Sequence, residues 1–285
     1  MASSLKSILL SAIPLRAKQF IKHCRASHNG YLAWRDRVRW PANPDRPEDV
    51  DAAPNFLHEY FKAHQAGHGI FKWDHYFDIY DRHLKSFRGR DIVIVEIGIY
   101  SGGSLEMWRE YFGPNCKIVG VDIEPACKSY ESSSVRVFIG DQADREFWRR
   151  FKQEVGMVDI LIDDGGHSSQ QQIVTLEEML PQLKPGGVYI CEDIHSEFNR
   201  FASYVQGLEQ NLNAYECVAN PNQNERAITS PASALQDAIE AIHHYPFLTV
   251  IERRKSPIGE FVAPKRGTQW QPFLDAYNTG IHRRS

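Results

Sequence analysis

The sequence lacks the features that mark several classes of protein. Its five cysteines are widely spaced, and none of them forms a C-x-x-C pair. This argues against a disulfide framework and against a zinc site built from thiolates, and it fits a reducing cytoplasm. Cys191 falls within an apolar run, and we interpret it as a small core residue. The sequence also contains no internal repeat and no low-complexity tract.

Long apolar runs and an excess of basic charge are missing as well. No apolar stretch of roughly 18 residues occurs, so we expect no transmembrane segment. Residues 1–27 contain only the short apolar patch Ile8–Leu10 and lack the apolar stretch of a secretory signal. The net charge of −3 gives no reason to expect nucleic acid as a partner. We expect a cytoplasmic protein.

The basic residues that are present gather at the start of the chain. Residues 1–42 carry eight Lys and Arg and a single acid, Asp36. A basic, acid-free start is also typical of a mitochondrial presequence. We favour a terminal helix that docks on the main domain or on a partner subunit, which is compatible with a homo-oligomer.

Three regions follow from the composition. Residues 1–54 are interpreted as a basic N-terminal extension with a Pro-rich linker. Residues 55–90 have apolar side chains at helical spacing and are predicted to form a helical cap that covers a cofactor. Residues 91–285 are predicted to form the main domain, which begins with alternating strands and helices. That alternation is the signature of a doubly wound α/β sheet.

The strands of the main domain are predicted from short apolar runs. They are Ile92–Ile97, Lys117–Asp122, Val135–Ile139, Val158–Asp163 and Val188–Glu192. Helices are predicted around Ser104–Tyr111, Arg145–Glu154, Gln171–Leu183, Arg200–Tyr215 and Pro231–His244. The runs Phe247–Glu252 and Ile258–Ala263 flank a polar turn and are typical of a β-hairpin. We therefore expect an α/β fold with a mostly parallel, seven-stranded sheet that closes with an antiparallel hairpin, plus an N-terminal helical extension.

Acidic residues end several of the predicted strands. Asp163 and Asp164 end the fourth strand and precede His167, and Glu192 and Asp193 end the fifth. Because ligands bind beyond the carboxyl ends of parallel strands, we expect these side chains to converge on one crevice. A crevice of this kind can hold a cofactor, a divalent metal and a base, which indicates an enzyme.

The first strand carries an acid, Glu96, and opens into a glycine-rich turn. The nicotinamide fingerprint G-x-G-x-x-G is absent, and an acid here would repel a pyrophosphate and suit a cationic amine. At the end of the second strand, Asp122 can accept hydrogen bonds from ribose hydroxyls. After the third strand, Asp141 and Gln142 can meet an adenine. These residues would together bind a ligand with an amine, a ribose and a base. S-adenosylmethionine has all three groups.

Structural alternatives remain open for these residues. The glycine-rich turn can serve only to pack a helix on a strand, and Asp122 alone can be a helix cap. The residues predicted to bind the cofactor are Glu96, Gly98, Ser101, Gly102, Ser104, Asp122, Asp141, Gln142 and Asp163.

The stretch from Lys72 to His195, under half of the chain, resembles the class I S-adenosylmethionine-dependent methyltransferases of the macrocin and mycinamicin sugar O-methyltransferase type. The motifs that carry the resemblance are Lys72–Phe77, Glu96–Gly98, Gly102–Ser104, Gly120–Asp122, Gly140–Gln142, Ile162–His167, Leu183–Gly187 and Glu192–His195. The resemblance implies a Rossmann-like methyltransferase sheet, with S-adenosyl-L-methionine and Mg²⁺ or a similar divalent cation as cofactors.

The resemblance also implies roles for individual side chains. Asp164, Glu192 and Asp193 are expected to bind the metal, for which carboxylates are suitable hard ligands. His167 is expected to be the catalytic general base, and His195 is its rival or a substrate contact. Lys72 and Tyr76 are further candidates to touch the cofactor's carboxylate. Helix capping is the structural alternative for Asp164 and Asp193.

Together these inferences predict an Mg²⁺-dependent O-methyltransferase that acts on a sugar hydroxyl of a natural-product glycoside or a polysaccharide. The metal would chelate vicinal oxygens of the acceptor, and His167 would remove a proton. A catechol-like aromatic acceptor is an alternative that keeps the cofactor. A nucleotide-binding oxidoreductase and a non-catalytic scaffold are further alternatives. Neither the acceptor nor the oligomeric state follows from the sequence.

Overall fold

A computed structural model describes residues 14–36, 55–215, 227–264 and 266 of the chain. The predicted Pro-rich linker and the polar loop at Pro221–Arg226 lie outside these residues. The chain separates into two compact units, Met1–Ala53 and Pro54–Ser285. None of the helices within the described ranges is long and apolar enough to cross a membrane.

The described part of the first unit is the helix α2, which spans Leu15–Asp36. It falls in the region for which the sequence predicted an N-terminal helical extension. Phe20, Ile21 and Tyr31 are exposed on it.

A seven-stranded sheet organises the second unit. Its strands are β1 (Val93–Ile97), β2 (Lys117–Asp122), β3 (Val135–Ile139), β4 (Val158–Asp163), β5 (Leu183–Cys191), β7 (Ile239–Tyr245) and β8 (Leu248–Arg253). Their order in space is β3-β2-β1-β4-β5-β8-β7. The first five strands are mutually parallel, and β8 is antiparallel to both β5 and β7. The predicted mostly parallel, seven-stranded α/β sheet is confirmed.

Helices cover both faces of this sheet. They are α3 (Phe56–Ala63), α4 (Tyr76–Leu84), α5 (Gly103–Phe112), α6 (Arg145–Val155), α7 (Ser169–Met179), α8 (Arg200–Leu212) and the short α9 (Ala234–Ala238). Short 3₁₀ helices occupy Lys85–Phe87, Pro125–Tyr130 and Leu180–Gln182. Helices α3, α4 and α5 share one buried apolar cluster with the sheet, and α6, α7 and α8 share another. This two-sided cover is the doubly wound arrangement.

The central strand β4 shows why the carboxylates at the strand ends are buried. All six of its residues, Val158–Asp163, are buried, because helices lie on both faces of the sheet. Such strands read as continuous apolar runs rather than as alternating patterns. The run stops at Asp163, where the chain leaves the sheet.

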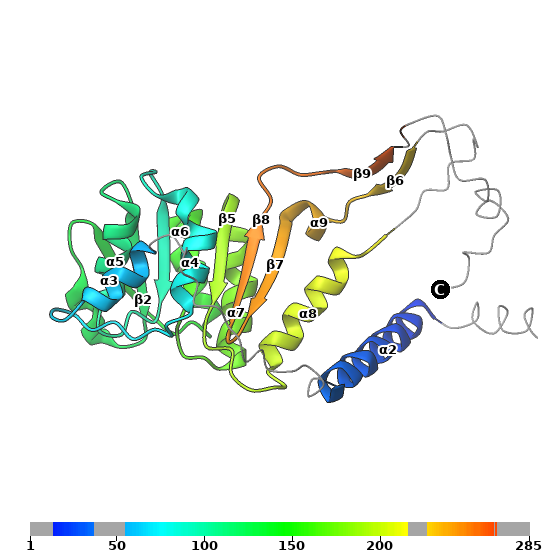
Figure 1. The fold of residues 1–285 in the computed structure, drawn as a ribbon, viewed down its shortest axis with the longest axis horizontal. Coiled ribbons are helices and arrows are strands. Elements are labelled where there is room, and N and C mark those ends of the chain that lie inside the picture. Colours follow the sequence, from blue (N-terminus) through cyan, green and yellow to red (C-terminus); the bar gives the residue numbers. More distant parts are fainter. Residues whose placement is uncertain (1–13, 37–54, 216–226, 265, 267–285) are drawn as a thin grey trace, which may run out of the picture. The chain divides into compact units, whose positions relative to one another are not determined.

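The closing hairpin is not the one that the sequence pattern predicted. The strand β8 pairs with β7, which precedes it, and Figure 1 shows β8 (orange) between β5 and β7. The predicted helix over Pro231–His244 was wrong beyond Ala238. The segment predicted as the second hairpin strand, Ile258–Ala263, instead contributes to β9 (Glu260–Pro264). This strand pairs with β6 (Ala227–Pro231) in a separate two-stranded sheet.

The misassigned helix has a physical explanation in β7. The register between β7 and β8 shifts between Ile239 and Ala241, as in a β-bulge. The bulge turns Ile239 and Ile242, three residues apart, to the same buried cluster. Apolar residues three apart imitate the spacing of a helix, so the sequence alone favours the wrong element.

Candidate functional site

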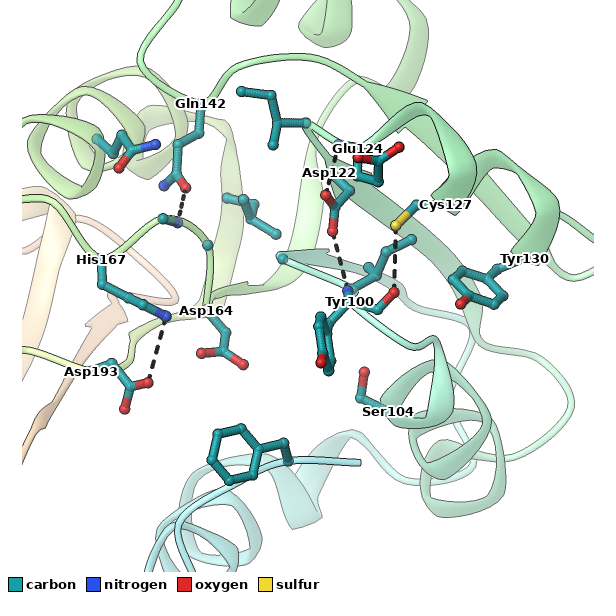
Figure 2. Close-up of a pocket in the computed structure, with 18 of the residues that line it drawn as sticks. Tyr100, Ser104, Asp122, Glu124, Cys127, Tyr130, Gln142, Asp164, His167 and Asp193 are labelled. Atoms are coloured by element: carbon teal, nitrogen blue, oxygen red, sulfur yellow. Dashed lines mark hydrogen bonds and ion pairs between the residues drawn. The ribbon is translucent and has the colours of Figure 1, made fainter. Parts of the chain in front are cut away.

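A pocket of about 630 Å³ opens at the carboxyl ends of the parallel strands (Figure 2). Its size is typical of sites for small organic ligands. Eight of the predicted site residues line it: Gly98, Ser104, Asp122, Asp141, Gln142, Asp164, His167 and Asp193. The predicted site residues that do not line it are Glu96, Ser101, Gly102, Asp163 and Glu192.

The turn after β1 brings two walls of the pocket together. Gly98 has φ of 80°, and a Cβ atom at this position would overlap the carbonyl oxygen of Asp164. The Asp164 amide donates to the carbonyl of Ile97 at 3.0 Å. The turns after β1 and β4 therefore touch through their backbones, which only glycine permits here.

Asp122 and Asp141 lie where the second and third strands meet the pocket. Asp122 accepts backbone hydrogen bonds from Tyr100 at 3.1 Å and from Glu124 at 2.9 Å. Asp141 accepts one from the amide of Ala143 at 2.7 Å. These backbone contacts fix both carboxylates beside the pocket, while each carboxylate keeps further lone pairs for a ligand.

Gln142 and Asp163 are buried beneath the turn that carries His167. The Gln142 side chain accepts from the amide of Gly166 at 2.7 Å and donates to Asp163 at 2.9 Å. Burial raises the pKa of Asp163 to about 6, although hydrogen bonds from Gln142 and its neighbours oppose the shift. In this structure both side chains hold the turn in place, and Asp163 does not line the pocket.

Lys72 lies at the centre of the carboxylate cluster. Its Nζ is 2.7 Å from Asp164, 3.0 Å from Glu192 and 3.3 Å from Glu96, and its side chain is only 3% exposed. Burial raises the pKa of Glu96 and of Glu192, and the ammonium of Lys72 opposes both shifts. The sequence placed Lys72 in a recognised motif but gave no sign of this central role.

The remaining contacts of the cluster come from α4 and α5. The Tyr80 hydroxyl donates to Glu192 at 2.6 Å, and the Ser104 hydroxyl donates to Glu96 at 2.7 Å. Glu192 therefore faces Lys72 and Tyr80.

Asp193 stands between two histidines. Its Oδ2 is 3.7 Å from Nε2 of His167, and its Oδ1 is 3.7 Å from Nε2 of His195. Figure 2 shows His167 and Asp193 facing each other at the pocket, whereas His195 does not line it. Asp164, His167 and Asp193 each offer one ligand atom, and these atoms lie within 4.8 Å of one another.

The tip of the β7–β8 hairpin supports the same wall. The Tyr76 hydroxyl donates to Asp193 at 2.9 Å and lies 3.2 Å from the Phe247 carbonyl oxygen, and Trp73 donates to Asp193 at 3.0 Å. The Phe247 ring packs 5.4 Å from the rings of both Trp73 and His195. Sequence reasoning missed Phe247, because its partners lie far away in the chain.

Comparisons with known proteins agree with this fold. The family model for a methyltransferase domain matches residues 95–194. The chain is 29% identical over 205 residues to 8-demethyl-8-alpha-L-rhamnosyl tetracenomycin-C 2'-O-methyltransferase of Streptomyces olivaceus, an alignment that covers 66% of this chain and 53% of that protein. It is 31% identical to mycinamicin VI 2''-O-methyltransferase of Micromonospora griseorubida over 58% of this chain and 39% of that one. The chain thus spans about half the length of these curated relatives or less.

The fold also matches a solved structure. The MycE methyltransferase of the mycinamycin biosynthetic pathway, in complex with Mg and SAH, superimposes with a TM-score of 0.58 and 23% identity. That match covers 80% of this chain and 60% of the MycE chain. The resemblance to the macrocin and mycinamicin type of methyltransferase is confirmed, as is the Rossmann-like sheet.

Proposed function

We propose that this chain, whose residues 95–194 match a methyltransferase domain, is an S-adenosylmethionine- and Mg²⁺-dependent O-methyltransferase that acts on a sugar hydroxyl. One observation carries the proposal. The pocket at the strand ends borders directly on a group of two carboxylates and a histidine, Asp164, His167 and Asp193. The relatives named above are O-methyltransferases of glycosylated compounds, and MycE was solved with Mg and SAH.

The pocket fits S-adenosylmethionine in size and in the placement of its polar groups. The tight turn at Gly98 lets a ligand approach the backbone. Asp122 would accept hydrogen bonds from the ribose, and Asp141 would border the adenine. When bound, S-adenosylmethionine supplies the methyl group.

The carboxylates at the pocket edge fit a magnesium ion. Asp164 and Asp193 would hold it, since carboxylate oxygens are the ligands that Mg²⁺ prefers. We keep Glu192 as a proposed third ligand, because its carboxylate and that of Asp164 already share one cation, the Lys72 ammonium. When bound, the metal supplies a Lewis acid that lowers the pKa of a nearby hydroxyl.

His167 is the proposed general base. Its ring lines the pocket, and its Nε2 is 3.7 Å from Asp193. The Asp193 carboxylate is in turn held by Trp73 and Tyr76. An imidazole so placed can take a proton from an acceptor hydroxyl, and the Asp193 carboxylate stabilises the imidazolium that forms.

The acceptor would enter past exposed aromatic side chains at the mouth of the pocket. Phe71 is 89% exposed and Tyr100 is 75% exposed, and both line the pocket. Flat aromatic faces can pack against the apolar face of a sugar ring as well as against a catechol. The relatives favour the sugar. An acceptor with two neighbouring oxygens is also suitable, because those oxygens could bind the same metal ion as Asp164 and Asp193.

The base is tested by comparing His167→Ala with His195→Ala. We expect His167→Ala to bind S-adenosylmethionine like the parent in calorimetry but to lose roughly 10²- to 10⁴-fold in the rate of methyl transfer. His195→Ala is the matched control, since His195 lies on the other side of Asp193 and should keep most of the rate. The reverse result would make His195 the base.

The cofactor is tested by titrating S-adenosylmethionine and its demethylated product, with Mg²⁺ and with a chelator. Saturable binding of both, followed by methylation within a pool of glycosides and catechols, supports the proposal and names the acceptor class. Binding of a nicotinamide nucleotide in place of either compound would replace the methyltransferase with an oxidoreductase.

A further inference from the structure

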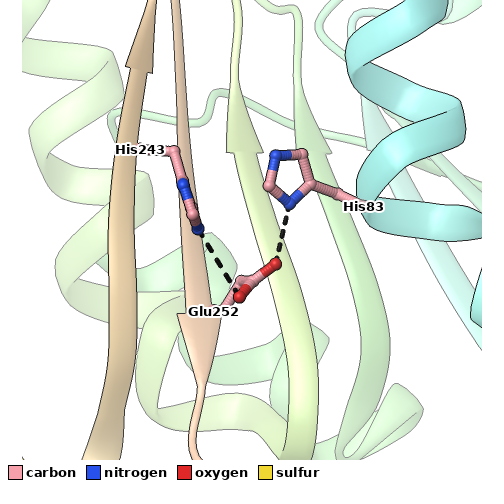
Figure 3. Close-up of side chains that lie close together, drawn as sticks. All are labelled: His83, His243 and Glu252. Carbon is pink, nitrogen blue, oxygen red and sulfur yellow. Dashed lines mark hydrogen bonds and ion pairs between the residues drawn. The ribbon is translucent and has the colours of Figure 1, made fainter.

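A second cluster of metal-ligating side chains lies outside the pocket. It consists of His83 of α4, His243 of β7 and Glu252 of β8, which converge in Figure 3. One ligand atom from each lies within 4.8 Å of the others. None of the three residues lines the pocket at the strand ends. The cluster joins a helix to both strands of the closing hairpin.

The hydrogen bonds of the cluster leave one nitrogen unsatisfied. Nδ1 of His83 is 2.7 Å from Glu252 Oε1, and its Nε2 is 2.8 Å from the Tyr245 hydroxyl. Nε2 of His243 is 3.5 Å from Glu252 Oε2 but is buried without a hydrogen-bond partner. A buried polar atom without a partner costs free energy, so its position needs an explanation.

We propose that His83, His243 and Glu252 form a binding site for a divalent transition metal of the zinc class. The ligand atoms are Nδ1 of His83, Nε2 of His243 and a carboxylate oxygen of Glu252. Two imidazoles and one carboxylate are a common three-ligand set for zinc, with a fourth position left for water. Imidazole also separates this site from the carboxylate cluster of the pocket, which favours Mg²⁺.

The distances suit a tetrahedral ion. Zinc bonds of about 2.0–2.2 Å place neighbouring ligand atoms roughly 3.3–3.5 Å apart. Oε2 of Glu252, at 3.5 Å from Nε2 of His243, already has this separation. His83 contacts the other oxygen, Oε1, at 2.7 Å, which is the length of a hydrogen bond, and a bound metal would replace that hydrogen bond.

The surroundings of His83 prepare it as a ligand. The His83 side chain is only 3% exposed, so its ring is held in place within the cluster. The Tyr245 hydroxyl can accept the proton of the second ring nitrogen and so fix the tautomer that presents Nδ1. Arg82, whose guanidinium is 3.4 Å from the same hydroxyl, adds positive charge and limits the affinity for a cation.

Metal at this site would fasten α4 to the hairpin. The first turns of α4 carry Tyr76 and Tyr80, which donate to Asp193 and Glu192 in the pocket. The site lies toward the other end of the helix, at His83. We therefore assign it a structural role, in which it stabilises the wall of the pocket without touching the reacting groups.

The test is equilibrium dialysis of the full chain against Zn²⁺ in excess Mg²⁺, with His243→Gln as the variant. His244→Gln is the matched control, because His244 is the next residue of β7 but contacts Thr249 and Glu209 instead. We expect the parent and the control to bind one zinc more per chain than His243→Gln. The loss of a ligand should weaken this binding at least about 100-fold, more than the loss of an outer partner does. Zinc should also raise the Tm of the parent and of His244→Gln, but not the Tm of His243→Gln.

Co²⁺ gives an independent readout of the coordination geometry. Intense visible bands, which mark four-coordinate Co²⁺, are expected in the parent and in His244→Gln and should be lost in His243→Gln and in Glu252→Gln. Methyl transfer should not depend on His243, which separates this site from the pocket. Equal zinc binding by the parent and His243→Gln, or none by either, would overturn the proposal and leave a hydrogen-bonded cluster.

Discussion

At the scale of single residues, Lys72 governs the charge balance of the pocket. Its ammonium contacts three carboxylates, two of which, Glu96 and Glu192, have side chains only 1% exposed. Charges buried to this extent must be paired, since their desolvation is expensive. Removing one partner of such a pair leaves the other uncompensated, which costs more than the pair contributes.

We expect Lys72→Met to lower the free energy of unfolding by about 3–5 kcal/mol near neutral pH. Lys117→Met is the control, because Lys117 pairs with Asp91 at 3.5 Å on the surface, where an ion pair contributes about 1 kcal/mol or less. Urea denaturation of both variants and of the parent measures the difference. Equal losses in the two variants would contradict the role assigned to Lys72.

The effect of Lys72→Met should depend on pH in a defined direction. Burial raises the pKa of Glu96 and Glu192, and without the ammonium nothing opposes this rise as strongly. An acid whose pKa is higher in the folded than in the unfolded chain destabilises the fold as the pH rises above its unfolded pKa. The deficit of the variant should therefore shrink as the pH falls toward that value.

Some contacts between single residues of the pocket can be predicted from the sequence, and others cannot. Asp164, His167 and Asp193 could be predicted to meet, because parallel strands end at one edge of a sheet. The partners of Lys72 lie 92 and 120 residues away, at Asp164 and Glu192. No local sequence pattern encodes such pairings. Buried carboxylates do imply that a positively charged group lies beside them.

At the scale of elements, the turns between strand and helix set the shape of the pocket. Gly98 is the sharpest case, since its φ of 80° and its contact with the Asp164 backbone both exclude a side chain. Gly113, at the end of α5, has φ of 88°, but a Cβ there would meet no atom within 4 Å. A comparison of Gly98 with Gly113 therefore distinguishes the cost of backbone strain from the cost of steric overlap.

We expect Gly98→Ala to destabilise the fold by roughly 2–6 kcal/mol, since it combines a strained backbone with overpacking. Gly113→Ala should cost only the strain, about 1–3 kcal/mol. Thermal denaturation compares the two variants, and calorimetry should show weaker binding of S-adenosylmethionine by Gly98→Ala alone. Indistinguishable variants would mean that the turns after β1 and β4 can move apart freely.

Elements differed in how well the sequence predicted them. The first four parallel strands were predicted to within one residue, because buried apolar runs between helices have few alternative interpretations. The fifth, β5, begins at Leu183, five residues before the predicted start at Val188. The hairpin was not predicted correctly, since a bulge in β7 gives Ile239 and Ile242 a helical spacing and β9 belongs to another sheet. Pairing between strands determines the structure of these segments, and the pattern of a single sequence does not show which strands pair.

At the scale of the whole molecule, the second unit contains both apolar clusters of the described residues. Their members run from Leu57 to Ile251, so every one of them lies within Pro54–Ser285. Helix α3 is part of this unit, because Leu57 is fully buried and Phe61 packs 4.7 Å from Phe77.

We expect residues 54–285, produced alone, to keep the Tm of the full chain and to lose only the helical circular dichroism signal of α2. Residues 67–285, which lack α3, are the control and should lose at least about 2–5 kcal/mol, the cost of removing one buried leucine. Thermal and urea denaturation of the three chains provide the comparison. A large loss on removal of residues 1–53 would show that the extension stabilises the main domain.

The position of β8 between β5 and β7 has a consequence for synthesis on the ribosome. The five parallel strands are complete when the chain has reached Cys191, but the partner of β5 at that edge ends only at Arg253. At about 5–20 residues per second, the nascent chain presents an open, apolar sheet edge for roughly 3–12 s. Such an edge is a template for pairing with other chains, so this interval is when the protein most needs a chaperone.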